Sequence, residues 1–153
     1  MKKKLKYISR RKALNFLGSA GLILYLPQFA KASTEMVSGA IEEIIDGKDS
    51  VNADIYLDLP EIAENGNQVK VSFEIDSPMT DDNFVRFVHV LADGNPAPKV
   101  ARFMFTPSAG VCSATTRMRL AKTQNVYLLA EFSNGSYAMA QSTVKVTIGG
   151  CGG

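Results

Sequence analysis

Residues 65–75, with the sequence NGNQVKVSFEI, contain a turn signal followed by a two-residue period. Asn65-Gly66 is typical of a tight turn. The apolar side chains of Val69, Val71, Phe73 and Ile75 then alternate with polar ones. Such alternation places every second side chain on one face, as in a β-strand with one buried face. The stretch therefore predicts a strand in a layered β-structure.

The same period recurs along most of the chain. The other expected strands cover residues 55–59, 84–92, 100–106, 113–120, 125–132 and 137–148. Turn chemistry separates them, for example Asp93-Gly94-Asn95-Pro96 and Asn134-Gly135. Seven short strands at this spacing predict a mainly β fold, an immunoglobulin-like antiparallel β-sandwich. We expect it to span residues 33–148 as one domain, which is large enough to bury a single core.

A helix is expected before the strands, from Thr34 as its cap to Gly47. Its apolar residues recur at helical spacing. They are Met36, Val37, Ala40, Ile41, Ile44 and Ile45.

Residues 1–32 have the pattern of an export signal peptide. Many Lys and Arg residues precede an apolar stretch over residues 13–26, which is shorter than the ~20 residues of a membrane-spanning helix. Ala30-Lys31-Ala32 has the small-x-small form of a signal-peptidase site. Residues 9–14 resemble a twin-arginine signal, although Ala13 stands where Phe is usual, so an ordinary secretory signal stays open. We expect a periplasmic protein that begins near Ser33 and has no membrane span.

Removal of this segment reverses the net charge. It holds eight of the seventeen Lys and Arg and none of the fifteen Asp and Glu, so the charge changes from +2 to about −6. Nucleic-acid binding, which needs clustered cations, loses its support. Thirteen of the acids lie in residues 33–82, and seven of the remaining Lys and Arg lie in residues 83–153. A polarised surface that orients docking partners and ordinary solvated strand faces are both open interpretations.

The last five residues differ from the rest of the chain. Cys151 is flanked by Gly149, Gly150, Gly152 and Gly153. Glycine visits nearly all backbone conformations, so these four residues predict a flexible arm over residues 149–153 on which nothing in the sandwich packs. The thiol would stand roughly 10 Å from the domain at full extension. Such a cysteine suits entry into the narrow active site of another protein.

The body of the domain offers little chemistry. His89 shares a face with Phe87 and Leu91 and is expected to be structural, and Asp81-Asp82 fits a solvated turn. Asn134-Gly135-Ser136 fits a hairpin turn better than a glycosylation site. No ligand spacing indicates a metal, and no cofactor is expected. The two-residue period of residues 113–120, extended back by one residue, places Cys112 on the apolar face, so we expect its thiol to be shielded. We expect no disulfide between Cys112 and Cys151.

The tail Val146-Thr147-Ile148-Gly149-Gly150-Cys151-Gly152-Gly153 resembles the carboxy-terminal carrier motif of the SoxY family of sulfur carriers. Most of the chain after the export segment shares the resemblance. It includes Asn95-Pro96-Ala97-Pro98, residues 100–103, residues 115–121 and Ala130-Glu131. Cys112 is a departure, because SoxY chains usually rely on the tail cysteine alone.

The resemblance implies a covalent carrier in thiosulfate oxidation, not an enzyme. Cys151 would be the attachment site, and a SoxZ-like subunit would form a heterodimer with this chain. A c-type haem enzyme would couple thiosulfate to Cys151, and a manganese-dependent hydrolase would release sulfate. A sulfane dehydrogenase would act where it is present. An unperturbed thiol is only a few per cent thiolate at neutral pH, so activation would come from the partner enzymes.

Two other classes of function stay open. One is an exported structural β-sandwich whose Cys151 forms an intermolecular disulfide. The other is a thiol chaperone for a soft metal such as Cu(I). A thiosulfate adduct formed only with the haem enzyme would separate the carrier from both.

Overall fold

The computed structural model describes the backbone of residues 29–150 and the side chains of residues 34–150. Residues 1–28 and 151–153 lie outside this range. Within it, helix α2 (Phe29–Ile45) precedes eight strands and two short 3-10 turns, η1 (Gly66–Gln68) and η2 (Pro107–Ala109). The strands are β1 (Ile55–Asp58), β2 (Ile62–Asn65), β3 (Val69–Ile75), β4 (Val85–Ala92), β5 (Lys99–Met104), β6 (Cys112–Met118), β7 (Gln124–Phe132) and β8 (Tyr137–Ile148).

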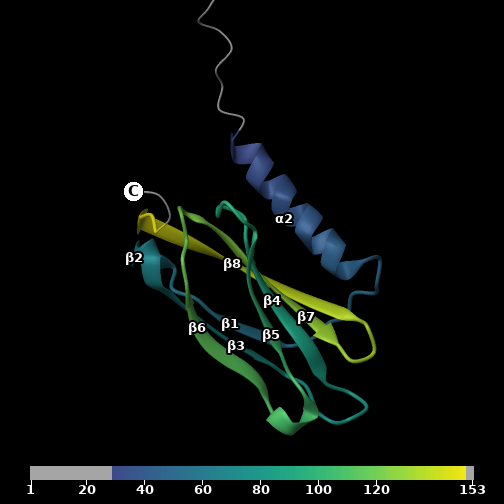
Figure 1. Cartoon of the computed structure of the whole chain (residues 1–153). Coiled ribbons are helices and arrows are strands. Elements are labelled where there is room, and N and C mark those ends of the chain that lie inside the picture. Colours follow the sequence, from purple (N-terminus) through teal and green to yellow (C-terminus); the bar gives the residue numbers. More distant parts are fainter. Residues whose placement is uncertain (1–28, 151–153) are drawn as a thin grey trace, which may run out of the picture.

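The strands form two facing sheets (Figure 1). One sheet has the order β1-β3-β6, and the other has the order β2-β8-β7-β4-β5. Neighbouring strands are antiparallel, except that β2 runs parallel to β8. The prediction of a mainly β sandwich with one N-terminal helix is confirmed.

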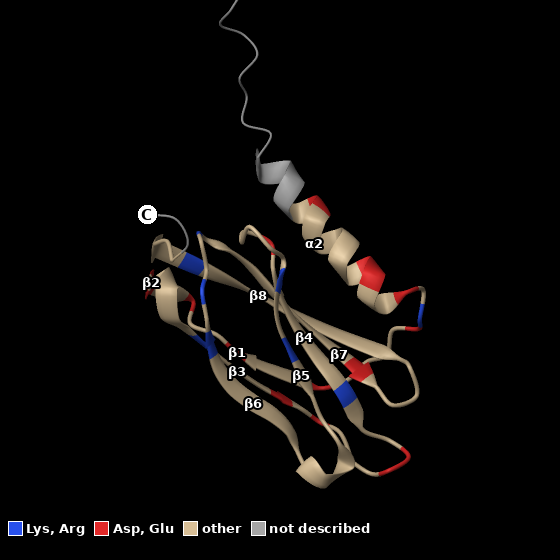
Figure 2. Cartoon of the chain, in the orientation of Figure 1, with Lys and Arg blue, Asp and Glu red and all other residues tan. Residues whose placement is uncertain are grey.

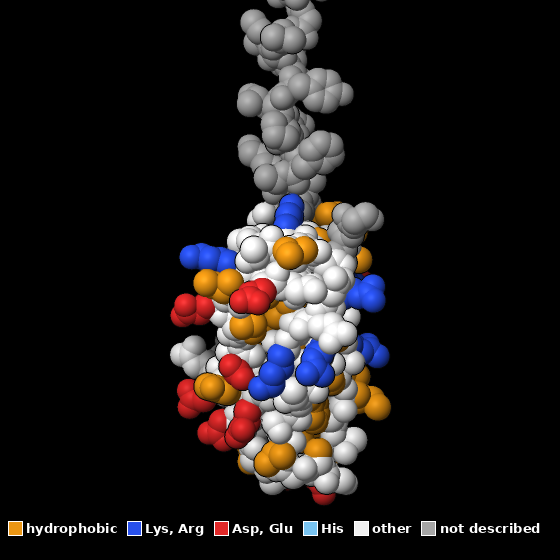
Figure 3. All heavy atoms as spheres, turned by 90° about the vertical axis from the view of Figure 1, so that its left-hand side faces the viewer, with side chains coloured by type: hydrophobic (Ala, Val, Ile, Leu, Met, Phe, Trp, Pro, Cys, Tyr) orange, Lys and Arg blue, Asp and Glu red, His pale blue; other side chains and the backbone are white. Residues whose placement is uncertain are grey.

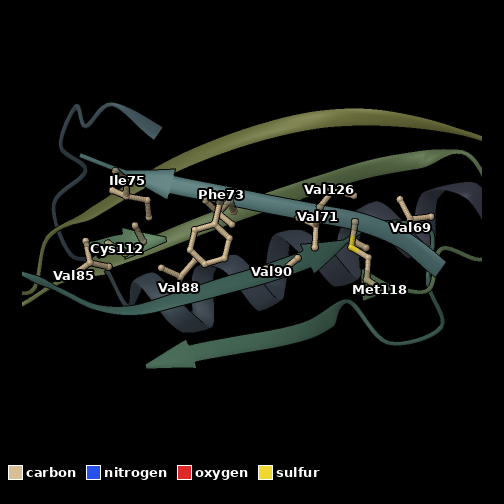
Figure 4. Packing of buried hydrophobic residues seen from close by; sticks show 14 of the residues in the cluster. Val69, Val71, Phe73, Ile75, Val85, Val88, Val90, Cys112, Met118 and Val126 are labelled. Carbon is tan, nitrogen blue, oxygen red and sulfur yellow. The ribbon is translucent and has the colours of Figure 1, made fainter. Parts of the chain in front are cut away.

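The core lies between the sheets and is centred on Phe73 (Figure 4). Val69, Val71, Phe73 and Ile75, the apolar residues of the opening stretch, are all buried, as their alternation predicts. The ring of Phe73 lies edge-on to the ring of Phe103, with 5.3 Å between the centroids. Each such side chain contributes about 1.5–3 kcal/mol through removal of apolar surface from water. Burial of these faces is what holds the two sheets together.

Helix α2 covers the outer face of the five-stranded sheet (Figure 1). Val37 and Ala40 pack against Leu91, Leu129 and Tyr137. The Tyr137 hydroxyl donates a 2.8 Å hydrogen bond to the carbonyl oxygen of Ile44, which satisfies an acceptor in the last helical turn. β8 is thereby attached to the end of the helix.

The bounds and the buried face of α2 differ in part from the prediction. The helix begins earlier than Thr34, at Phe29, because Ala and Lys at positions 30–32 are good helix formers. Met36, expected on the buried face, is 45% exposed. The C-terminal end agrees, since Gly47 has a φ of 70°, the left-handed conformation that follows many helices.

Strand β2 has no counterpart among the predicted strands. Of its four residues only Ala63 is buried, so the sequence shows no two-residue period there. The strand exists because it pairs with β8, with Ala63 opposite Val146 and Asn65 opposite Ile148. This register places Gly66, the residue after β2, beside the start of the glycine tail.

Charged side chains are partly segregated on the surface. Most acidic side chains lie on α2 and around β1 to β3, and most Lys and Arg lie on β4, β5, β6 and β8 and on the β6–β7 loop (Figure 2). On the face that carries the C-terminal end, Asp and Glu gather toward one side, and Lys and Arg occupy the middle and the other side (Figure 3). The segregation is incomplete, because Lys70 on β3 forms a 3.5 Å ion pair with Asp58 among the acidic side chains.

Candidate functional site

The predicted site residues fall into two groups. Cys151, Gly152 and Gly153 lie outside the described residues. Gly149 and Gly150 are described and follow β8 directly. The structure therefore bears on the base of the tail, and the roles of Cys151, Gly152 and Gly153 stay predictions.

The tail base lies against two backbone segments of the sandwich. The Gly150 amide donates a 2.9 Å hydrogen bond to the carbonyl oxygen of Leu120, and the Leu120 amide donates one of 2.8 Å to the carbonyl oxygen of Gly66. We call the four residues that Gly149 and Gly150 lie against, Gly66, Asn67, Leu120 and Ala121, the tail seat. Asn67 belongs to η1, which follows β2, and Leu120 belongs to the loop that follows β6.

Contact between tail and seat is as close as backbone allows. A Cβ on Gly149 would overlap the carbonyl oxygen of Ala121, and one on Gly150 would overlap the carbonyl group of Gly66. A Cβ on Gly66 would overlap the carbonyl oxygen of Leu120 and lie 2.8 Å from the Gly150 nitrogen. All these obstacles are backbone atoms, which cannot swing aside as a flexible side chain can.

This geometry differs from the expected arm in one respect. The sequence analysis expects nothing to pack on the tail and the arm to begin at Gly149. In the structure Gly149 and Gly150 contact the seat, so their lack of a Cβ has a steric reason. Their assignment to arm flexibility stays a prediction.

Side-chain hydrogen bonds brace the β6–β7 loop that forms half of the seat. Asn95 Nδ2 donates to the carbonyl oxygen of Arg119 at 2.9 Å, and Asn95 Oδ1 accepts from the Ala121 amide at 3.0 Å. The buried Gln124 donates through Nε2 to Asn95 Oδ1 at 3.0 Å. Its Oε1 accepts from the Gly94 amide at 2.6 Å. The β4–β5 loop thus holds the β6–β7 loop in place.

Sequence reasoning missed the seat. Asn65-Gly66 and residues 93–96 are visible in the sequence as turns, and turn chemistry does not reveal which segment packs on a turn. The three glycines in backbone contact, Gly66, Gly149 and Gly150, have no side chains whose pattern could reveal the contact. The only available signal was that Asn95 and residues 115–121 belong to the stretches that resemble the SoxY family.

Cys112 is buried, as its position on the apolar face predicts. Its side chain lies beside Ile75 and Val85 at one end of the core (Figure 4), and the residue is 1% exposed. Burial in apolar surroundings raises the pKa of the Cys112 thiol to about 12, because the thiolate would lose its hydration. The thiol is therefore protonated at neutral pH.

We expect Cys112 to alkylate at least about a hundredfold more slowly than Cys151 in the native protein at pH 7–8, because only the thiolate is nucleophilic. Iodoacetamide labelling followed by peptide mass spectrometry measures both rates. Labelling in denaturant, where the two rates should converge, is the control. Equal rates in the native protein would contradict the assignment.

Cys112 lies far from the base of the tail. Cys112 pairs with Ile75 at one end of β6, and Met118 pairs with Val69 at the other. At about 3.3 Å per residue, Cys112 lies roughly 25 Å from Leu120, to which Gly150 is bonded. A disulfide needs Cα atoms within about 7 Å, so the residue after Gly150 cannot reach Cys112 while the tail is seated.

His89 lies on the face of β4 that packs toward α2, and its role as a structural histidine stays a prediction. An open hollow of about 290 Å³ there is lined by His89, Lys99, Arg102 and Ile44 among others. Burial, and then the Arg102 charge, lower the pKa of His89 below its usual value. Within the described part of the chain, its buried Nε2 has no hydrogen-bond partner.

The other candidate motifs behave as turns. The Asn134 side chain accepts hydrogen bonds from the Ser136 amide at 2.9 Å and the Ser136 hydroxyl at 2.7 Å, which closes the β7–β8 hairpin.

Among the described residues, no group of three or more His, Cys, Asp or Glu could hold a metal ion. No helix in residues 29–150 is long and apolar enough to cross a membrane.

Comparison with known proteins gives one family. The model described as sulfur oxidation protein SoxY matches residues 41–151. Among solved structures, the sulfur carrier protein SoxY from Chlorobium limicola f thiosulfatophilum has 28% sequence identity and a TM-score of 0.62. That match covers 75% of this chain and 99% of that chain. No curated protein sequence matches this chain.

More distant structures share the fold alone. A superoxide reductase (neelaredoxin) from Ignicoccus hospitalis has 17% identity and a TM-score of 0.55, over 61% of this chain and 81% of that chain. A putative superoxide reductase from Thermotoga maritima also has 17% identity and a TM-score of 0.51. That match covers 67% of this chain and 89% of that chain. At these identities the likeness says nothing about activity.

Proposed function

This chain belongs to the SoxY family of sulfur oxidation proteins, and from that premise we propose that Cys151 is the covalent attachment site for the sulfur substrate. The family gives the chain a carrier role in sulfur oxidation. The finer assignment to Cys151 is supported by one observation above all. Gly150, the residue before Cys151, is held at the end of the sandwich, whereas the thiol of Cys112 is enclosed.

The proposed loading step is an oxidative coupling. The Cys151 thiolate and the outer sulfur of thiosulfate form an S–S bond, which gives cysteine S-thiosulfonate and releases two electrons. The partner enzyme of the c-type haem class would accept these electrons. A hydrolase of the manganese type would then add water across the S–SO₃ bond, which releases sulfate and leaves a cysteine persulfide. A sulfane dehydrogenase, where present, would oxidise the remaining sulfur.

The carrier would leave activation to its partners. The SoxY family implies a partner subunit in a SoxYZ complex, and we propose a SoxZ-like chain as that partner. The residues that line the hollow beside His89 include no carboxylate and no thiol. The charges of Arg102 and Lys99 lower the pKa of His89, which makes it a weaker base. These features support a division in which partner enzymes supply the haem, the metal and the catalytic base.

Incubation with thiosulfate and the haem enzyme tests the proposal. The expected product is a protein heavier by one S₂O₃ group, and peptide mapping should place the group on Cys151. A disulfide-linked dimer alone would not support the proposal, since any exposed thiol can dimerise. A thiosulfate group on Cys112, or none with an active enzyme, would contradict it.

Export to the periplasm is the proposed localisation, in line with a family that is typically exported. We expect the mature protein to begin at or near Ser33, after Ala30-Lys31-Ala32. Cleavage there would leave the buried helix contacts intact, because Val37 is the first buried residue described on α2. Intact mass of the exported protein measures the start. A mass that retains residues 13–26 would indicate a membrane anchor instead.

A further inference from the structure

Three segments far apart in the sequence meet at the tail seat. They are Gly66 after β2, the loop 119–122 after β6, and Gly149-Gly150 after β8 (Figure 1). A fourth segment, the β4–β5 loop, reaches the second of these through Asn95. Neither the buried core nor a hairpin turn requires these contacts, since β8 already ends at Ile148.

Resting on the proposed role of Cys151, we infer that the seat holds the tail up to Gly150, and that Gly66 is a positioning residue for the Cys151 thiol. The arm that is proposed to enter the partners' active sites would then begin at Cys151 and not at Gly149. Gly66 acts through the tail backbone and touches neither the substrate nor the thiol.

Glycine at position 66 is required by the space and not by the backbone conformation. Gly66 is buried and is not among the residues with positive φ, so alanine could adopt its conformation. Its Cβ would nevertheless overlap the carbonyl oxygen of Leu120 and lie 3.0 Å from Cγ1 of Val146. Either the β6–β7 loop or the tail must move away. The side chain of Asn95 braces the loop, whereas the described hydrogen bond from the tail to the seat is that of the Gly150 amide.

The seat also limits where partners can take the thiol. A chain that is released from Gly149 would carry the thiol roughly 10 Å from the sandwich. The Cα of Cys151 is always about 4 Å from that of Gly150, so a chain whose Gly150 amide is bonded to Leu120 would keep Cys151 near the β6–β7 loop. A partner enzyme must therefore approach the end of the sandwich closely, with the β4–β5 and β6–β7 loops as the nearest parts of its contact surface.

Amide hydrogen exchange in the mature protein tests the seat itself. We expect the Gly150 amide to exchange at least about tenfold more slowly than the amides of Gly152 and Gly153, because it donates to Leu120. Two-dimensional NMR of uniformly ¹⁵N-labelled protein resolves the three amides. Exchange of Gly150 at the rate of Gly152 would overturn the inference, whatever the variants do.

The positioning role is tested with Gly66→Ala and the matched control Gly39→Ala. Gly39 lies on the exposed side of α2 and a Cβ there meets nothing within 4 Å. For Gly66→Ala we expect the KM of the haem enzyme for the carrier to rise about tenfold or more, because a small misplacement of a reacting group is costly. Alkylation of Cys151 by iodoacetamide should stay as fast as in the unaltered protein, which a loss of folding or of the thiol would not predict.

The outcomes separate this inference from the proposed function. Gly66→Ala with an unchanged KM overturns the positioning role. If Gly66→Ala does not fold, protection of the Gly150 amide in the unaltered protein still decides the seat. An unaltered protein that cannot be loaded overturns the proposed function and the positioning role with it, while the exchange result stands by itself.

Discussion

Replacing Cys151 with Ser is expected to abolish thiosulfate loading, with no detectable adduct under conditions that load the unaltered protein completely. Serine keeps the shape of the side chain and removes the sulfur that forms the bond to thiosulfate. Fold stability should stay unchanged, because Cys151 follows the last described contact of the tail, at Gly150. Adduct mass and thermal unfolding measure the two results.

Cys112→Ala is the matched control for this variant. Cys112 is 1% exposed and packs in the main core, so its truncation should lower the free energy of unfolding by about 1 kcal/mol or more. Loading should continue at Cys151. If Cys151→Ser were loaded and Cys112→Ala were not, the attachment site would have to be reassigned.

The double variant Gly149→Val with Gly150→Val is expected to lower the loading rate about a hundredfold while small alkylating agents still react with Cys151. Two effects act together. The β-branched side chains restrict and widen the arm. Their Cβ atoms also overlap the carbonyl oxygen of Ala121 and the carbonyl group of Gly66, so the tail must leave its seat. Single-turnover loading and iodoacetamide labelling give the two rates.

Gly152→Val with Gly153→Val adds the same side chains beyond the seat. If glycine serves only to keep the arm narrow and flexible, the loading rate should fall to a similar extent in both double variants. If the seat matters as well, the loss should be clearly larger for positions 149 and 150. If the Gly149→Val, Gly150→Val variant were loaded at the rate of the unaltered protein, both the proposed flexible arm and the proposed role of the seat would be wrong.

Most of the sandwich could be predicted because its strands have one buried face. β3 and β6 show the two-residue period, and β8 has the predicted bounds of residues 137–148. The same period correctly placed Cys112 inside the core. β2 could not be predicted, since only Ala63 is buried and its partner lies in the last strand of the chain.

The cysteine of the candidate site could be predicted from the sequence, but the contacts between the tail base and the seat could not. Glycines around a cysteine indicate mobility, yet the same residues permit close backbone contact. Which of the two applies depends on what lies within a few ångströms. For Gly149 and Gly150 that is Ala121 and Gly66, which follow other strands, so no local pattern could reveal it.

The position of β8 in its sheet has a mechanical consequence. β8 lies between two strands, pairing with β7 along residues 137–144 and with β2 along residues 145–148, so the two ladders follow one another along the strand. A terminal strand at the edge of a sheet could be peeled off one hydrogen bond at a time by a force on its end. A pull on Gly150 along the strand instead loads two ladders of hydrogen bonds in shear, and many bonds must break together. We therefore expect that, if partner enzymes draw the tail into their active sites as proposed, the pull leaves the sandwich folded.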